Sequence, residues 1–268
     1  MEKTRIAYVT THPTDVFPLI SAYREIVDEV GDFAELQLRS KEDLMMANQF
    51  EEFVQFASSS HLIIFHLHGG KKSLSCFDDL ASKLEMAGVP IHAQATASEH
   101  DTELIKLSTV DNNVFRSISR YLNYGGKDNF KGLLIYVANR FGGADYVAAE
   151  PKRPIWDGIY HPDFDHVPTL EEYLKQKHVD GRPTVGIWFY NGLWQSGNTA
   201  FVDRLIAEIE GQGANVIPLF MYSLKDVELG TKGADWVMEN YFIRDGRPII
   251  DVLISLLMFS LSIWSSDE

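Results

Sequence analysis

The chain has 268 residues, of which 45% are hydrophobic and 23% charged, a balance typical of globular rather than disordered proteins. Its 38 acidic residues outnumber its 24 Lys and Arg residues, and the net charge of −14 disfavours binding to nucleic acids, whose phosphates it repels. The single cysteine, Cys76, excludes an internal disulfide and a multi-thiolate metal site within one chain.

Hydropathy predicts a protein without a membrane span. The sequence from Met1 runs directly into a strand-like segment, with no apolar signal region. Residues 249–264 are nearly all apolar, but they are fewer than the roughly 20 that a membrane-spanning helix needs. We therefore expect a buried strand followed by a packed turn there, and a cytoplasmic location.

Strand patterns alternate with helical patterns in the first half of the chain. Because helices separate the strands, right-handed parallel crossovers connect them, and the strands form a doubly wound sheet. This flavodoxin- or Rossmann-like pattern places the chain in the α/β class. The expected strands are residues 5–10, 33–38, 61–67 and 89–95.

Capping and glycine signals mark the helix boundaries. The first helix is expected to end at Gly31, and a later one at Gly88. Ser40 starts a helix between them, with Asp43 in position to complete a capping-box-like pair. The apolar stripe of that helix consists of Leu44, Ala47, Phe50 and Val54.

A connector separates this unit from a second α/β pattern. Two helical patterns, 110–121 and 130–141, each end at a pair of glycines and complete the first domain. Prolines then break the periodicity, although the aromatic side chains among them predict that the connector packs on the domains. Three later strands predict a smaller, incomplete sheet. We expect domains at 1–143 and 184–268, the connector at 144–183, and strands of the second domain at 184–190, 215–220 and 250–257.

Ligands of an open parallel sheet bind beyond the carboxyl ends of its strands. The loop of residues 10–15 follows the first strand, is rich in hydroxyl groups and precedes a helix. It is either an anion-binding loop at the helix N-terminus or a turn capped by Thr14 or Asp15.

Two histidines end the third strand. His66 and His68 are two residues apart and share a face, so both imidazoles can reach one ligand or metal ion. The alternative is that they are merely hydrogen-bonded at the strand end. Gly69 and Gly70 follow, and they permit close approach of the backbone to a flat ligand.

Two further stretches lie in the connector and the second domain. Tyr160 and His161 are either a rigidly presented polar pair or part of a structural turn that pins the connector. The long loop 190–199 combines an aromatic platform with amides and hydroxyls. It either lines a site for a large planar ligand or caps the next helix through Asn198 or Thr199.

Several catalytic signatures are missing from the sequence. It contains no GxxxxGK[ST] phosphate loop, no G-x-G-x-x-G, no HExxH and no G-x-S-x-G. No pair of carboxylates indicates a general acid and base. We therefore do not expect this chain to hydrolyse ATP itself.

Ordered landmarks run through almost the whole chain, and together they resemble the amino-terminal part of the large subunit of class I tetrapyrrole metal chelatases. Those subunits are CobN of cobaltochelatase and the H-type subunit of magnesium chelatase. Each landmark is weak singly, but their order and spacing are specific. They are residues 66–70, 104–109, 121–129, 157–162, 185–187, 197–200, 215–218 and 223–226.

The resemblance implies a chain that helps bind a tetrapyrrole, either a corrinoid or a porphyrin, into which a ligase complex of cobalamin or porphyrin biosynthesis inserts cobalt or magnesium. The implied partners are the rest of the large subunit and AAA+ motor subunits, which use ATP and magnesium. No cofactor is expected on this chain, and alone it is expected to be inactive because the body that closes over the macrocycle is not in it. The implied ligand contacts are His66, His68, Gly69, Gly70, Tyr160, His161, Tyr190, Trp194 and Asn198, with His66, His68 and His161 as candidate metal ligands.

Two other functions stay open at the level of sequence. The chain is alternatively a scaffold that binds the rest of the chelatase but no ligand, or a flavodoxin-like binder of a small molecule at residues 10–15. In each case the apolar last strand, once exposed, favours association, so we expect a homodimer or a tightly packed tail.

Overall fold

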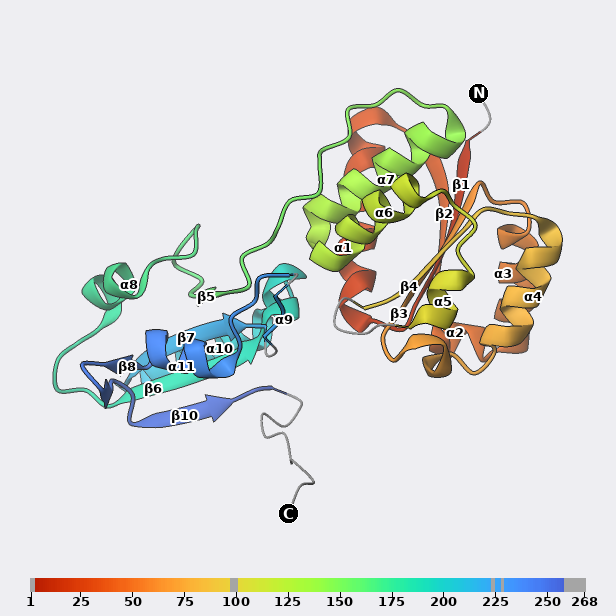
Figure 1. Ribbon diagram of the computed structural model, residues 1–268. Coiled ribbons are helices and arrows are strands. Elements are labelled where there is room, and N and C mark those ends of the chain that lie inside the picture. Colours follow the sequence, from red (N-terminus) through yellow and green to blue (C-terminus); the bar gives the residue numbers. More distant parts are fainter. Residues whose placement is uncertain (1–2, 97–100, 223–224, 228, 258–268) are drawn as a thin grey trace, which may run out of the picture. The chain divides into compact units, whose positions relative to one another are not determined.

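The computed structural model divides into two compact units, Met1–Pro154 and Ile155–Glu268 (Figure 1). The segment 144–183, predicted as a connector, falls on both sides of this division. None of the described helices is long and apolar enough to cross a membrane. The residues that the structure describes are 3–96, 101–222, 225–227 and 229–257.

Among its described residues, the first unit contains a four-stranded, wholly parallel sheet, as the alternation of strands and helices predicted. The strand order is β2-β1-β3-β4, so the first strand lies between the second and the third. The strands are β1 (Thr4–Thr10), β2 (Ala34–Ser40), β3 (Leu62–Leu67) and β4 (Ile91–Ala95).

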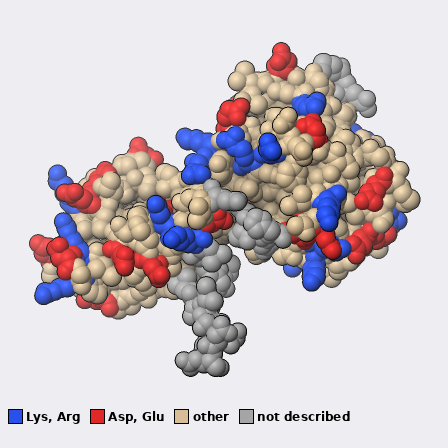
Figure 2. All heavy atoms as spheres, viewed as in Figure 1, with Lys and Arg blue, Asp and Glu red and all other residues tan. Residues whose placement is uncertain are grey.

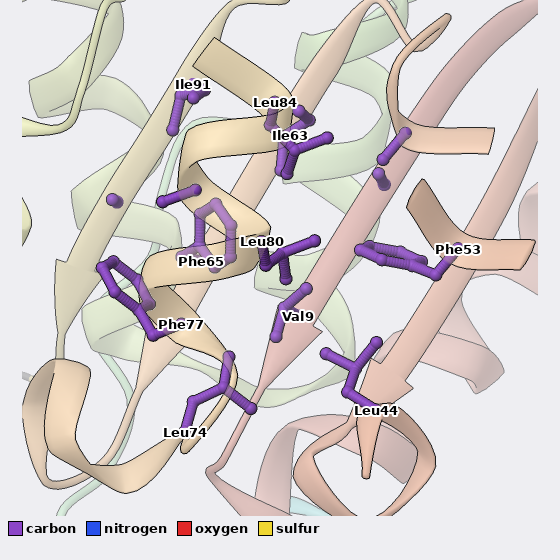
Figure 3. Packing of buried hydrophobic residues seen from close by; sticks show 14 of the residues in the cluster. Val9, Leu44, Phe53, Ile63, Phe65, Leu74, Phe77, Leu80, Leu84 and Ile91 are labelled. Carbon is purple, nitrogen blue, oxygen red and sulfur yellow. The ribbon is translucent and has the colours of Figure 1, made fainter. Parts of the chain in front are cut away.

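Alternate side chains of these strands enter two separate cores. On one face Val9 and Phe65 pack with Phe53 and Leu80 of the covering helices (Figure 3). All four side chains are fully buried, and burial of each stabilises the fold by roughly 1.5–3 kcal/mol. The elements on this side are α2 (Lys41–Leu44), α3 (Ala47–Ala57), the short 3-10 helix η1 (Gly70–Ser73), α4 (Phe77–Ala87) and α5 (Thr102–Lys106).

The opposite face of the sheet is covered by three longer helices. Tyr8 and Ile64 point to this side and pack with Leu19, Ile118 and Leu133. The predicted pair of helices with Gly-Gly ends is present, and it packs beside the first helix. The three helices are α1 (Pro13–Val30), α6 (Asn112–Tyr124) and α7 (Gly126–Gly142).

The predicted capping box is confirmed, whereas the helix that it starts is shorter than expected. The amide of Asp43 donates to the Ser40 hydroxyl (3.3 Å), and the Ser40 amide donates to the Asp43 carboxylate (2.8 Å). However, α2 ends at Leu44, and a separate helix, α3, begins at Ala47. The buried residues of α3 are Phe50, Phe53, Phe56 and Ala57, so Val54 lies at the edge of the predicted stripe.

Residues 144–154 have no regular structure, yet two asparagines of α7 fasten them. Asn139 exchanges two hydrogen bonds with the backbone of Tyr146, at 2.7 and 2.9 Å. Asn129 does the same with the backbone of Lys152, at 2.8 and 2.9 Å. This part of the predicted connector is therefore packed on the first unit rather than hanging free.

The same packing leaves no room at Gly132 of α7. A Cβ atom there would lie 2.7 Å from Cε1 of Tyr121 and 2.8 Å from the carbonyl oxygen of Ala149. The Tyr121 hydroxyl donates to that carbonyl (2.7 Å), so neither neighbour can move independently. We expect Gly132→Ala to lower the free energy of unfolding of the first unit by roughly 1–3 kcal/mol, measured by hydrogen exchange of α7 peptides.

The matched control for that substitution is Gly211→Ala in the second unit. A Cβ atom at Gly211 would meet nothing within 4 Å, and this glycine also lies in a helix. Alanine should therefore be neutral there or stabilise by up to about 1 kcal/mol. Equal effects of the two substitutions would contradict the packing argument.

In the described part of the second unit, four strands form a mixed sheet of order β10-β6-β7-β5. The sequence predicted only three of them. The additional strand, β5, comes from the segment predicted as connector and pairs antiparallel with β7. The strands are β5 (Asp157–Ile159), β6 (Thr184–Tyr190), β7 (Asn215–Met221) and β10 (Val252–Ser255).

Helices cover both faces of this sheet as well. Trp188 and Leu219 pack on one side with Tyr173 of α8 and Val237 of α11, whereas Phe189 packs on the other side with α10. The remaining elements of the unit are α8 (Leu170–Lys177), α9 (Asn191–Gln195), α10 (Ala200–Gly211), α11 (Ala234–Tyr241) and the two-stranded pair β8 (Ile243–Arg244) and β9 (Arg247–Pro248).

The prediction of a buried last strand is wrong for the residues that can be described. β10 pairs with β6 on one side only, and Val252 and Leu253 are 56% and 37% exposed. An apolar sequence indicates that burial of a strand would be favourable. Whether the strand is buried depends on which other elements pack against it in the tertiary structure. The predicted turn and packed tail lie at residues 258–268, outside the described residues.

Candidate functional site

The topology of the first sheet places a switch point at the carboxyl ends of β1 and β3. The chain leaves β1 for α1 on one face of the sheet, and it leaves β3 for α4 on the other face. Neighbouring strands whose helices diverge in this way form the switch point at which open α/β sheets bind ligands. Thr11, directly after β1, donates its backbone amide to the carbonyl of His66 (3.3 Å) and its hydroxyl to that of His68 (3.1 Å).

Asp15, in the first turn of α1, is the centre of a buried polar cluster at this point. Its side chain is only 4% exposed. One carboxylate oxygen, Oδ2, accepts hydrogen bonds from the Tyr8 hydroxyl (3.0 Å) and the Thr10 hydroxyl (2.9 Å), and it contacts Nδ1 of His66 (2.6 Å). The other oxygen contacts Nδ1 of His12 (3.1 Å). A single carboxylate therefore joins groups from β1, β3 and the loop between β1 and α1.

The neighbours of Asp15 stabilise its ionised form. Burial by itself would raise the pKa of the Asp15 carboxyl, but His66 and His12 keep that pKa well below its ordinary value. Burial raises the pKa of the Tyr8 hydroxyl, and the nearby Asp15 charge raises it further, so Tyr8 stays a protonated donor. The negative charge of the cluster is therefore on Asp15, and the Tyr8 hydroxyl stays neutral beside it.

Neither form of the predicted cap at this loop is present. The N-cap residue of α1 is His12, and it makes no side-chain capping hydrogen bond. The carboxylate of Asp15 is directed into the cluster, and the Thr14 hydroxyl contacts the His12 ring instead. The buried charge of Asp15 also disfavours a phosphate at this helix N-terminus, which was the alternative reading of residues 10–15.

The two ring nitrogens of His66 have different surroundings. Its Nδ1 faces Asp15, whereas its buried Nε2 has no hydrogen-bond partner among the described residues. The ring of His12 lies 5.8 Å from that of His66 and 5.7 Å from that of His68. His12, Asp15 and His66 each offer a ligand atom, and these atoms lie within 4.8 Å of one another.

Sequence reasoning found His66 and His68 but did not group His12 and Asp15 with them. The available signal was positional, since residues 12–15 follow β1 directly and β1 is the neighbour of β3. His68 lies at the edge of the cluster, and its Nδ1 contacts the Thr96 hydroxyl (3.1 Å).

The glycine pair after His68 serves an internal contact. Gly69 and Gly70 have φ values of +87° and +63°, and a Cβ atom at Gly70 would lie 2.4 Å from Oδ2 of Asp101. That oxygen accepts the backbone amide of Lys71 (3.1 Å). The absence of a side chain at Gly70 therefore lets the Asp101 carboxylate lie close to the backbone, in the space that was predicted for a flat ligand. Around it lies a depression of about 510 Å³, lined by Gly69, Gly70, Lys71, Lys72, Asp101, Thr102 and Glu103.

In the second unit, the polar atoms of Tyr160 and His161 are bonded to α10. The Tyr160 hydroxyl donates to Asp203 (2.7 Å) and also contacts the Thr199 hydroxyl (2.9 Å). Buried His161 places Nε2 3.2 Å from Glu210, about two helical turns further along α10 than Asp203. These contacts agree with the interpretation of Tyr160 and His161 as part of a structural turn that pins the connector.

The stretch 190–199, predicted as a long loop, lies at the carboxyl end of β6, and its residues Asn191–Gln195 form helix α9 instead. Trp194 stacks in parallel on Phe220, with ring centroids 4.2 Å apart, and the Tyr190 ring lies 6.2 Å from that of Tyr222. Asn198 is exposed. The predicted cap is wrong here too, because Thr199 is the N-cap residue of α10 but makes no side-chain capping bond.

The predicted site residues thus form two groups. His66, His68, Gly69 and Gly70 lie at the carboxyl edge of the first sheet, and the other predicted contacts belong to the second unit. His161, the third candidate metal ligand, is also in that unit, where its two ring nitrogens face Glu210 and the amide of Asp163. Within the first unit, the residues beside His66 are His12 and Asp15.

Fold and site together define a protein of the doubly wound α/β class, built of two units, with a polar cluster at the switch point of the first sheet. Comparison with known proteins refines this. The CobN/Magnesium Chelatase family model matches residues 119–268, more than half of the sequence. The chain belongs to the CobN/magnesium chelatase family.

Individual relatives agree with this assignment. An uncharacterised protein of Methanocaldococcus jannaschii is 34% identical over 96% of this chain and 21% of its own length. The aerobic cobaltochelatase subunit CobN of Pseudomonas aeruginosa is 26% identical over 82% of this chain and 17% of its own length. This chain therefore spans about a fifth of the length of these curated relatives.

A solved structure supports the fold. The catalytic subunit of cobaltochelatase from Mycobacterium tuberculosis matches with a TM-score of 0.55 at 18% identity, over 86% of this chain and 18% of that one. The predicted α/β class and the predicted family are both confirmed.

Proposed function

We propose that this chain is the part of a cobalt- or magnesium-chelatase large subunit that helps to hold the tetrapyrrole while a metal ion is inserted. The observation that carries the proposal is the family match over residues 119–268, together with similarity to a CobN subunit over 82% of the chain. As the resemblance to the chelatase large subunits implies, separate AAA+ motor subunits would supply the energy of ATP, and this sequence itself contains no phosphate loop.

Exposed or half-buried groups at the carboxyl end of β6 are the proposed contacts in the second unit. Trp194, already parallel to Phe220, offers an aromatic surface for a macrocycle, and Tyr190 and Asn198 lie before and after α9, the short helix that contains Trp194. Tyr160 and His161 would act as positioning residues, since their polar atoms are held by α10. In the first unit the proposed contacts are His66, His68, Gly69 and Gly70.

Electrostatics favour an amidated ring over a polycarboxylate. The chain carries a net charge of −14, which repels a polyanionic porphyrin. Figure 2 nevertheless shows Lys and Arg interspersed with Asp and Glu on the visible face of each unit, so that face is not uniformly acidic. A corrinoid whose side-chain carboxylates are partly amidated would be repelled least.

A titration of the chain with a metal-free diamidated corrinoid and with a metal-free porphyrin tests the proposal. We expect a saturable shift of the Soret band together with quenching of tryptophan fluorescence. Trp194→Leu should weaken binding roughly 2- to 10-fold, because stacking on an aromatic ring contributes about 0.5–1.5 kcal/mol.

Trp236→Leu is the matched control, because Trp236 is a partly exposed tryptophan on α11 of the same unit. It should leave the affinity unchanged. If neither ring gives a saturable change, tetrapyrrole binding by this chain is refuted, and the result favours a scaffold that binds only the rest of the chelatase.

A further inference from the structure

We propose that His12, Asp15 and His66 form a binding site for a divalent ion of a late first-row transition metal, of which Co²⁺ is the probe. The two imidazoles supply nitrogen ligands, and Asp15 supplies the compensating negative charge. That such an ion would be the one inserted into the macrocycle rests on the proposed function, whereas the binding itself does not.

The first argument is that the donor groups are already assembled. One ligand atom from each of the three residues lies within 4.8 Å of the others. In a tetrahedral site with ligands at about 2.0–2.2 Å, neighbouring ligand atoms are about 3.4 Å apart. Closure on an ion therefore needs a small adjustment, and the His12 side chain, 23% exposed at the edge of the cluster, is the member free to make it.

The second argument is that both imidazoles present the same nitrogen to one carboxylate. Nδ1 of His12 lies 3.1 Å from one oxygen of Asp15, and Nδ1 of His66 lies 2.6 Å from the other. An ion held between the three side chains would bind Nδ1 of each neutral imidazole, and the ring hydrogens would then lie on Nε2. The His66 side chain is 3% exposed, so its ligand atom is fixed inside the first unit rather than on a mobile surface.

The third argument concerns the class of metal. Imidazole nitrogens suit zinc, copper, nickel, cobalt and iron, whereas Mg²⁺ prefers oxygen ligands and retains several waters. Two imidazoles and one carboxylate therefore select against Mg²⁺. The buried carboxylate of Asp15 and the net charge of −14 both favour a cation at this place.

Equilibrium dialysis of the chelator-treated full chain against Co²⁺, combined with visible absorption of the bound ion, tests this site. We expect one Co²⁺ per chain in this site, no displacement by a hundredfold excess of Mg²⁺, and at least tenfold weaker binding in His12→Ala. Because His12 is partly exposed and makes no capping bond, this variant should fold, which a thermal melt checks. Asp15→Asn should weaken binding roughly 10- to 100-fold.

His166→Ala is the matched control, since it removes an exposed histidine from the second unit. It should leave binding unchanged. Absence of bound Co²⁺, equal binding by His12→Ala, or displacement by Mg²⁺ would each overturn the site. Because these readouts contain no tetrapyrrole, loss of tetrapyrrole binding with Co²⁺ binding intact would refute the proposed function and leave the metal site standing.

Discussion

Replacing Asp15 with alanine is expected to lower the free energy of unfolding of the first unit by about 3–5 kcal/mol, the cost typical of breaking a buried charged network. Asp15 satisfies the hydroxyls of Tyr8 and Thr10 and faces Nδ1 of both His12 and His66. Alanine would leave these groups without their acceptor in a buried part of the first unit. Each buried group left unpaired costs about 1–3 kcal/mol, partly recovered by relaxation.

The readout must be specific to the first unit. All five tryptophans follow Pro154 in the sequence, so tryptophan fluorescence reports on the second unit. Hydrogen exchange of peptides from β1 and β3 should show the loss, while the fluorescence transition stays where it is. Asp28→Ala is the control, because Asp28 is an exposed carboxylate on the same helix. A loss for Asp15→Ala no greater than that for Asp28→Ala would contradict the central role of Asp15.

The first unit is also expected to lose stability in mild acid because of His92. This histidine is fully buried in β4, where its Nε2 contacts Gln94 (2.9 Å) and its ring lies 4.7 Å from that of Phe115. Burial lowers the pKa of His92 to about 3, while the Gln94 contact opposes the shift. His92 is therefore neutral in the folded protein at pH 5.

The sign of the effect follows from proton binding. The unfolded chain takes up a proton at His92 below pH 6.5, whereas the folded chain does so only near pH 3. Between these values the unfolded state binds more protons, so stability falls as the pH falls. At about 1.4 kcal/mol for each pH unit, the expected loss is about 3 kcal/mol between pH 7 and pH 4.5.

The comparison of wild type with His92→Asn isolates this contribution. Asparagine does not titrate, so the difference in unfolding free energy between pH 7 and pH 4.5 should shrink by most of that amount. Measurement by hydrogen exchange of first-unit peptides at the two pH values checks it. The tryptophan transition of the second unit is the internal control and should be the same in both proteins. An unchanged pH dependence of the first unit would show that His92 does not stay neutral in the fold.

The candidate site could be predicted only in part. His66, His68 and the glycine pair were visible because they end an apolar strand, and strand ends are where open sheets bind ligands. Asp15 was considered only as a possible helix cap, because Asp is among the preferred N-cap residues. Its actual partners, Tyr8 and His66, reach it only when β1 lies between β2 and β3.

The amino-acid sequence by itself determined the α/β class, the parallel first sheet, the Ser40–Asp43 capping box and the family, because periodicity, caps and ordered landmarks are local properties of the chain. Only the tertiary structure decided that β5 joins the second sheet, that β10 is an exposed edge and that Asp15 is buried between two histidines. The reason is physical: strand pairing, burial and the sharing of one carboxylate all depend on residues far apart in the sequence.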